Sequence, residues 1–221
     1  MRTTYRLKTV KLQEIQLQKH ERFTKLLELI DNGRKIIYID EIIFKPYKVE
    51  KKSWAKKGQN QVLQKEGLSL KTMAATVAIS MDRGLEGYQI KQKSMSKRDT
   101  KAIIEYLGAF NHQKGIVIFW DNLRSHHSYT VQDQIKAQQW TCLFNAPYSP
   151  EFHCIEEIFS YVKKVYKEKV ISQDFNINQQ QHNVIIQQSI ECIELELVRK
   201  VIQRHLEKMK SYLNLIQANQ F

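Results

Sequence analysis

The sequence predicts an α/β protein in which a mixed sheet carries helices on its faces. Two short apolar runs, at residues 35–40 and 115–120, are rich in β-branched residues and are typical of strands buried on both faces. The first strand segments follow one another without an intervening helix, which favours an antiparallel meander. The later strands alternate with helices, as parallel strands do.

The first half of the chain begins with a predicted helix over residues 11–31. Its apolar residues fall mostly on one face, and Gly33 can take the left-handed conformation that ends a helix. The strands expected after it span residues 35–44, 49–54, 72–81 and 85–90. Pro46 ends the first of them, and residues 82–84 form the turn between the last two.

The second half alternates helices and strands. Helices are expected at residues 97–110, 126–138 and 153–168, strands at 115–120 and 140–144, and a helical segment at 182–217. Ser125 can cap the helix at 126–138, and the prolines of residues 146–150 require a turn. We therefore expect three parts: a linker helix at 1–34, a domain built on the mixed sheet at 35–170, and a helical tail at 171–221 packed on that domain.

Composition favours a soluble, non-secreted protein with a polyanionic partner. The 221 residues contain 35 Lys and Arg against 23 Asp and Glu, a net charge of +12, and such an excess attracts nucleic acid phosphates. No apolar run approaches the roughly 20 residues of a membrane-spanning helix, and the N-terminus is too polar for a secretion signal. Three widely spaced cysteines exclude a complete disulfide framework and favour reduced thiols inside a cell.

Three acidic residues are placed where they could share one site. Asp40 and Asp121 each end an apolar strand, and Glu156 follows an apolar position of a predicted helix. Because strand side chains alternate, Asp40 and Glu41 point to opposite faces, so only one of them can share a site with Asp121. Carboxylates that meet repel one another unless cations neutralise them, and their hard oxygens suit magnesium or manganese. Taken singly, each acid also fits a structural role at a strand end or in a first helical turn.

Four segments resemble the catalytic domain of mariner-type DDE transposases and of related bacterial insertion-sequence transposases. Residues 38–41 (YIDE) resemble the family's first acid motif, and residues 53–58 (SWAKKG) are similar to its W-x-x-x-G element. Residues 120–126 (WDNLRSH) match D-N-x-x-x-H, and residues 146–156 (APYSPEFHCIE) match P-Y-S-P-x-x-N-P-I-E. The 34 residues at positions 122 to 155 separate the second acid from the third, which is the family's spacing when the third acid is Glu.

The resemblance covers roughly residues 35–215 and implies a ribonuclease H-like fold with transposase activity. Asp40, Asp121 and Glu156 would be the catalytic residues and would hold two Mg²⁺ or Mn²⁺ ions about 4 Å apart, with Asp40 bridging both. Water would first free a 3′-OH, which would then attack target DNA. The implied partners are transposon ends and target DNA, and the implied assembly is a homodimer.

The chain departs from the family pattern at two places. His153-Cys154 replace the usual Asn-Pro before the third acid, while the acid itself is kept. Only about 35 residues precede the first strand, where family members usually carry helix-turn-helix modules that read the transposon ends. We therefore expect a fragment, a truncated element or a domesticated copy, with DNA recognition supplied by a separate domain or subunit.

Other residues are assigned to supporting roles. Asn122 and His126 are expected to orient ligands or phosphate; the alternatives are helix capping for Asn122 and an ordinary surface position for His126. The predicted DNA-binding residues are Lys51, Lys52, Lys56, Lys57, Lys163 and Lys167. The last two share the helix face of Glu156, and a solvated lysine face explains them almost equally well.

Three alternatives stay open from sequence alone. The first is a transposase-derived DNA-binding or scaffold protein without activity, which the truncation and the His153-Cys154 change favour. The second is another ribonuclease H-like nuclease or integrase, and the third is a basic protein–protein adaptor. The expected location is the nucleus of a eukaryotic host, or the cytoplasm of a bacterium.

Overall fold

The computed structural model describes residues 9–45, 70–123, 126–173 and 177–218. The expected strand at 49–54 lies outside these ranges. The elements are α1 (Thr9–Asp31), β1 (Ile36–Phe44), β2 (Met73–Ser80), β3 (Gly84–Gln92), α2 (Lys97–Phe110), β4 (Val117–Trp120), α3 (Tyr129–Ala137), β5 (Thr141–Phe144), the 3₁₀ helix η2 (Pro150–Phe152), α4 (Ile155–Ser172), α5 (Gln179–Glu191) and α6 (Leu195–Ala218). No helix within the described ranges has a stretch that is both long and apolar enough to cross a bilayer.

The five strands form one mixed sheet in the order β3-β2-β1-β4-β5. β1, β2 and β3 are antiparallel neighbours, as a meander requires, whereas β4 and β5 run parallel to β1. Helices α2 and α3 supply the crossovers that parallel strands need. The predicted mixed sheet with helices on its faces is therefore confirmed.

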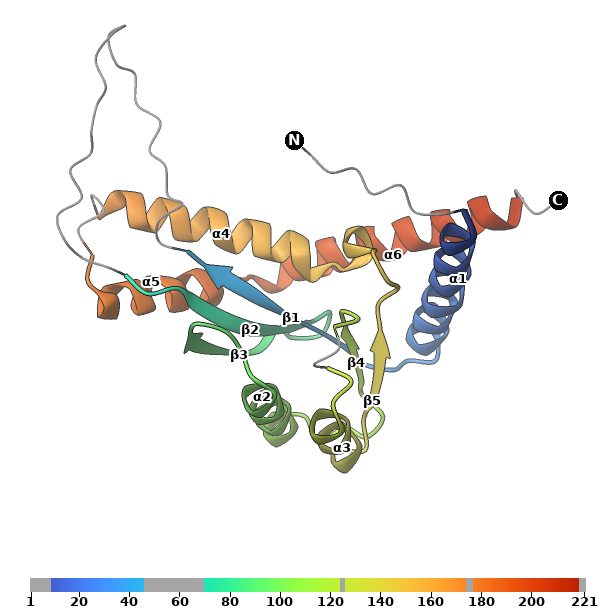
Figure 1. The fold of residues 1–221 in the computed structure, drawn as a ribbon, viewed down its shortest axis with the longest axis horizontal. Coiled ribbons are helices and arrows are strands. Elements are labelled where there is room, and N and C mark those ends of the chain that lie inside the picture. The colour runs from blue at the N-terminus through green and yellow to red at the C-terminus, as the bar shows by residue number, and fades with distance from the viewer. Residues whose placement is uncertain (1–8, 46–69, 124–125, 174–176, 219–221) are drawn as a thin grey trace, which may run out of the picture.

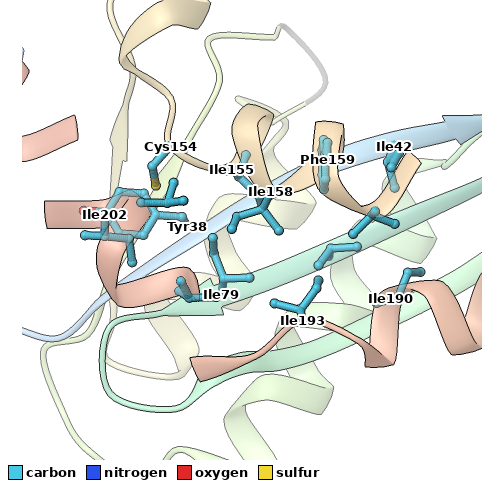
Figure 2. Packing of buried hydrophobic residues seen from close by; sticks show 14 of the residues in the cluster. Tyr38, Ile42, Ile79, Cys154, Ile155, Ile158, Phe159, Ile190, Ile193 and Ile202 are labelled. Carbon is cyan, nitrogen blue, oxygen red and sulfur yellow. The ribbon is translucent and has the colours of Figure 1, made fainter. Parts of the chain in front are cut away.

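Each sheet face is covered by its own group of helices (Figure 1). Alternate residues of β1 enter different cores: Tyr38 and Ile42 pack with α1, α4, α5 and α6, whereas Ile37 and Ile39 pack with α2 and α3. Figure 2 shows the first core, where side chains from α4 and α6 meet those of β1 and β2. Because both faces are buried, the central strands are apolar at nearly every position.

The structure refines two helical predictions. The segment at 182–217 is helical as expected but contains a break, since α5 ends at Glu191 and α6 begins at Leu195. Residue 193 donates its backbone N–H to Ile190, so the chain turns there, although no Gly or Pro marks the break. The helix expected at 126–138 begins later, with Ser128 as its N-cap residue, while Ser125 lies outside the described residues.

Asn178 caps α5 and offers a test of local stability. Its side chain accepts the backbone N–H of Gln181, whose side chain accepts the backbone N–H of Asn178 in return. Asn178→Ala is expected to lower the free energy of unfolding by about 1 kcal/mol, because the side-chain cap of α5 is lost. Gln180→Ala, an exposed change in the same turn, should cost much less in urea denaturation; equal losses would contradict the capping assignment.

Candidate active site

Asp40 and Asp121 are brought together by the register between β1 and β4. These strands run parallel, and Tyr38 pairs with Phe119. Two residues further along, the same offset places Asp40 beside Asp121, which directly follows β4. Asp40 lies two residues after Tyr38, and Asp121 lies two residues after Phe119. Since Tyr38 and Phe119 belong to the core under α4, the two acids face the same side of the sheet.

Glu156 joins them from the first turn of α4. The backbone N–H of Glu156 donates to the carbonyl of His153 at 3.1 Å, which fixes the start of the helix after η2. Asp40, Asp121 and Glu156 line the same cavity, whose volume is about 580 Å³. The three acids expected to share a site therefore line one cavity, although 34 residues separate the last two in sequence.

The cavity is an unfavourable place for uncompensated negative charge. Asp40 is only 8% exposed, and its burial, followed by the charges of Asp121, Glu41 and Glu156, raises its pKa to about 8. The backbone N–H of Glu41, which donates to Asp40 at 2.7 Å, offsets only part of this increase. A cation bound among the three carboxylates would remove the repulsion that raises this pKa.

The imidazole of His126 contacts the carboxylate of Asp121. Its Nδ1 lies 2.7 Å from Oδ1 of Asp121 and its Nε2 lies 3.3 Å from Oε1 of Glu41. The contact with Asp121 is a close ion pair whose N–H direction is poorly aligned for a hydrogen bond. Burial lowers the pKa of His126, but the two carboxylates outweigh burial and raise it to about 9.

The imidazole is therefore protonated near neutral pH, and it in turn shifts Asp121. Burial alone would raise the pKa of Asp121, but His126 lowers it below its ordinary value. The imidazole stacks on Trp120 with ring centroids 4.0 Å apart and is 1% exposed. The ordinary surface position considered for His126 is therefore wrong, and its contact with Asp121 agrees with an orienting role.

The donor set suits a hard divalent cation. Three carboxylates offer oxygen ligands of the kind that Mg²⁺ and Mn²⁺ prefer. With the side chains as they stand, no three His, Cys, Asp or Glu residues in the described ranges are grouped closely enough to hold an ion. Glu156 is exposed. It can therefore turn toward the strand-end acids more easily than a buried residue could.

The turn between β5 and α4 forms another wall of the cavity. Asn145 is buried, accepts the backbone N–H of Ala146 at 2.9 Å and donates its amide to the carbonyl of Ser149 at 2.8 Å. Its backbone N–H donates to Trp120 at 2.7 Å, which ties this turn to the end of β4. Arg22 of α1 donates to the carbonyls of Phe144 and Asn145 at 3.1 and 2.8 Å.

Arg22 was not singled out from the sequence, because nothing local indicates that α1 reaches residues more than 120 positions away. Arg22→Met keeps the length of the side chain but removes its donors to two partly buried carbonyls. We expect the free energy of unfolding to fall by about 1–3 kcal/mol. Lys25→Met, at an exposed position of the same helix, is the matched control. Similar urea midpoints for the two variants would contradict this role.

The remaining predicted residues have different outcomes. Asn122 lines the cavity, and its Oδ1 lies 2.7 Å from Nε2 of His127. Lys163 and Lys167 are exposed on α4, on the side that also carries Glu156. Lys51, Lys52, Lys56 and Lys57 lie outside the described residues. All DNA-binding assignments therefore stay predictions.

The sheet order, the helices on both faces and the acids at the ends of β1 and β4 define the ribonuclease H-like class of folds. Solved structures of Mos1 mariner transposase share this fold. Its catalytic domain is 12% identical with a TM-score of 0.66, covering 96% of this chain and 97% of that one. Its paired-end complex with the left transposon end is 14% identical with a TM-score of 0.65, covering 97% of this chain and 64% of that one. The Mos1 catalytic domain has also been solved with Mn and with Mg.

The sequence then identifies the family. A family model described as DDE superfamily endonuclease matches residues 35–177, and the chain belongs to this family. No curated protein matches the chain in a sequence search. The chain spans 64–66% of the length of the Mos1 chains in the paired-end complexes. At 11–15% identity the likeness to Mos1 concerns the fold.

Proposed function

We propose that this chain is the catalytic part of a DNA transposase, which cleaves and joins DNA strands with divalent cations held by Asp40, Asp121 and Glu156. The observation that carries the proposal is the convergence of these three carboxylates in one cavity. They come from β1, the end of β4 and α4, and all lie within the segment that matches the endonuclease family. Magnesium and manganese in structures of the Mos1 catalytic domain support the choice of metals.

The chain's own residues have distinct tasks in this reaction. Asp40, Asp121 and Glu156 present oxygens to the cations, while His126 keeps Asp121 charged and in place. When bound, the cations polarise the scissile phosphate and lower the pKa of the attacking water. In cleavage, a water oxygen forms a bond to phosphorus as the strand's 3′ oxygen leaves and takes up a proton. In strand transfer, that 3′-OH attacks a target phosphate, and one P–O bond forms as another breaks.

DNA is the proposed partner because the protein and its substrate have opposite charge. The chain carries a net charge of +12, and the exposed Lys163 and Lys167 extend from the site along α4. The Mos1 complexes contain transposon ends, which supports the same partner here. We further propose a homodimer, a separate domain or subunit that recognises the DNA sequence, and action in the compartment that holds the host DNA.

The test is nicking of supercoiled plasmid by the purified chain with Mg²⁺ or Mn²⁺. We expect nicks that EDTA abolishes and that Asp121→Asn does not produce. DNA binding, measured separately, should weaken steeply between 50 and 200 mM salt, as phosphate contacts require. Equal cleavage by Asp121→Asn would refute the assignment. Salt-sensitive binding without cleavage by either protein would instead favour a transposase-derived binding protein.

A further inference from the structure

His153 is a buried histidine in the wall of the acidic cavity. It is 1% exposed, and it lines the cavity together with Asp40, Asp121 and Glu156. Neither of its ring nitrogens has a hydrogen-bond partner within the described part of the chain. Buried polar atoms are nearly always satisfied, so these nitrogens favour a partner that enters the cavity.

The backbone holds this imidazole in a defined place. The N–H of His153 donates to the carbonyl of Pro150 at 3.0 Å, and its own carbonyl accepts the N–H of Glu156 at 3.1 Å. The ring lies against Phe119, with centroids 5.3 Å apart. The backbone of His153 is thus fixed between η2 and α4, three residues before the third acid.

Burial determines the charge state of the His153 imidazole. Burial lowers the pKa of His153 to about 4 even though the charge of Asp121 opposes this shift, so the ring is neutral near pH 7. A neutral imidazole has one nitrogen lone pair free to bind a cation. Both ring nitrogens of His126 are already engaged, by the carboxylates of Asp121 and Glu41.

We propose that a ring nitrogen of His153 is a ligand of a divalent cation held by Asp121 and Glu156, and that this ligand shifts the preference of the site from Mg²⁺ toward Mn²⁺. The inference rests on the proposed function, because it requires that the acids bind a cation. Mg²⁺ takes oxygen ligands, whereas first-row transition ions also accept imidazole nitrogen. The family motif has Asn at this position, so His153→Asn is the informative replacement.

The first test detects the bond between metal and nitrogen directly. Untagged protein is loaded with Mn²⁺ alone, and electron spin echo modulation measures coupling of the manganese to ¹⁴N. The native chain should show this coupling, His153→Asn should lose it, and His112→Asn, which removes an exposed histidine, should keep it. Coupling that persists in His153→Asn, or that is absent from the native chain with Mn²⁺ bound, overturns the inference.

The second test measures the affinity for Mn²⁺ and Mg²⁺, and it distinguishes failure of the inference from failure of the proposed function. In calorimetric titrations, His153→Asn should weaken Mn²⁺ binding about tenfold or more and Mg²⁺ binding far less. Asp121→Asn should weaken both ions. If Asp121→Asn weakens both but His153→Asn affects the two ions equally, His153 only packs against Phe119 and the proposed function stands. If Asp121→Asn changes neither, the metal site and the inference both fail.

Discussion

Asp40→Asn is expected to reduce metal-dependent DNA cleavage by about 1,000-fold or more while leaving DNA binding intact. Under the proposed function, the substitution removes a carboxylate ligand of the cation from the cavity that Asp121 and Glu156 also line. A cation at such a site contributes several kcal/mol of transition-state stabilisation, and each 1.4 kcal/mol corresponds to about tenfold in rate. Single-turnover nicking measures the first effect, and salt-dependent binding to a labelled duplex measures the second.

The same variant should be more stable than the native chain when no metal is present. Asp40 is a buried carboxyl beside two other acids, and its pKa of about 8 reports how strongly the fold disfavours its charge. The neutral amide avoids this repulsion, so the melting temperature without metal should rise by a few degrees. Added Mn²⁺ should stabilise the native chain and not the variant.

Asp82→Asn is a suitable control, because it changes an exposed acid in the turn between β2 and β3. It should alter neither cleavage nor the response to Mn²⁺. A variant of Asp40 that is inactive but less stable than the native chain would indicate a structural role for this residue.

Glu86→Ala is expected to lower the free energy of unfolding by about 3–5 kcal/mol. Glu86 on β3 is buried, and its carboxylate lies 2.5 Å from Nζ of Lys35. It also accepts hydrogen bonds from Ser80 at 2.5 Å and from Asn111 at 3.2 Å. Truncation leaves Lys35 without its ion-pair partner in a largely buried position, and it removes the link between β1, β2, β3 and the end of α2.

The control is Glu105→Ala, since Glu105 forms an exposed pair with Lys101 within α2. Exposed pairs contribute at most about 1 kcal/mol, so this loss should be small. Urea denaturation of both variants gives the comparison. Similar losses for Glu86 and Glu105 would show that the buried network does not contribute as inferred.

The contribution of Glu86 should also depend on pH. Burial alone would raise its pKa, but Lys35, Ser80 and Asn111 outweigh burial and lower the pKa below the ordinary value of 4.5. A carboxyl with a lowered folded-state pKa stabilises the fold above its unfolded pKa, and this contribution is lost as pH falls through the folded value. The difference in unfolding free energy between the native chain and Glu86→Gln should therefore be constant near pH 7 and shrink below pH 4.5.

The sequence by itself determined the order of the described elements and singled out the three acids, because both depend on local patterns. Apolar runs with β-branched residues marked β1 and β4, and Asp40 and Asp121 stood out because each ends such a run. The spacing to Glu156 and the segments around the acids then indicated the family, which the match over residues 35–177 confirms. The helix over residues 97–110 was predicted from its apolar pattern with the bounds that the structure shows, and the structure adds a capping box of Ser96 and Asp99 at its start.

Only the tertiary structure decided which of these residues meet. The register of β1 against β4 places Asp40 beside Asp121, and no local pattern encodes that register. Glu41, on the opposite side of β1, reaches the site indirectly through His126. The break between α5 and α6 also depends on packing, because both helices bury apolar residues on the same sheet face. The apolar periodicity of the sequence continues through the break and so does not reveal it.

The sequence likewise did not predict that two histidines are buried. The sequence around His126 and His153 would also fit an exposed loop, yet both side chains are 1% exposed. Their opposite pKa shifts come from what surrounds them in space: two carboxylates face His126, whereas apolar burial dominates at His153. Residue identity specifies that an imidazole can change its charge or bind a metal, and the packing around it decides which of these it does.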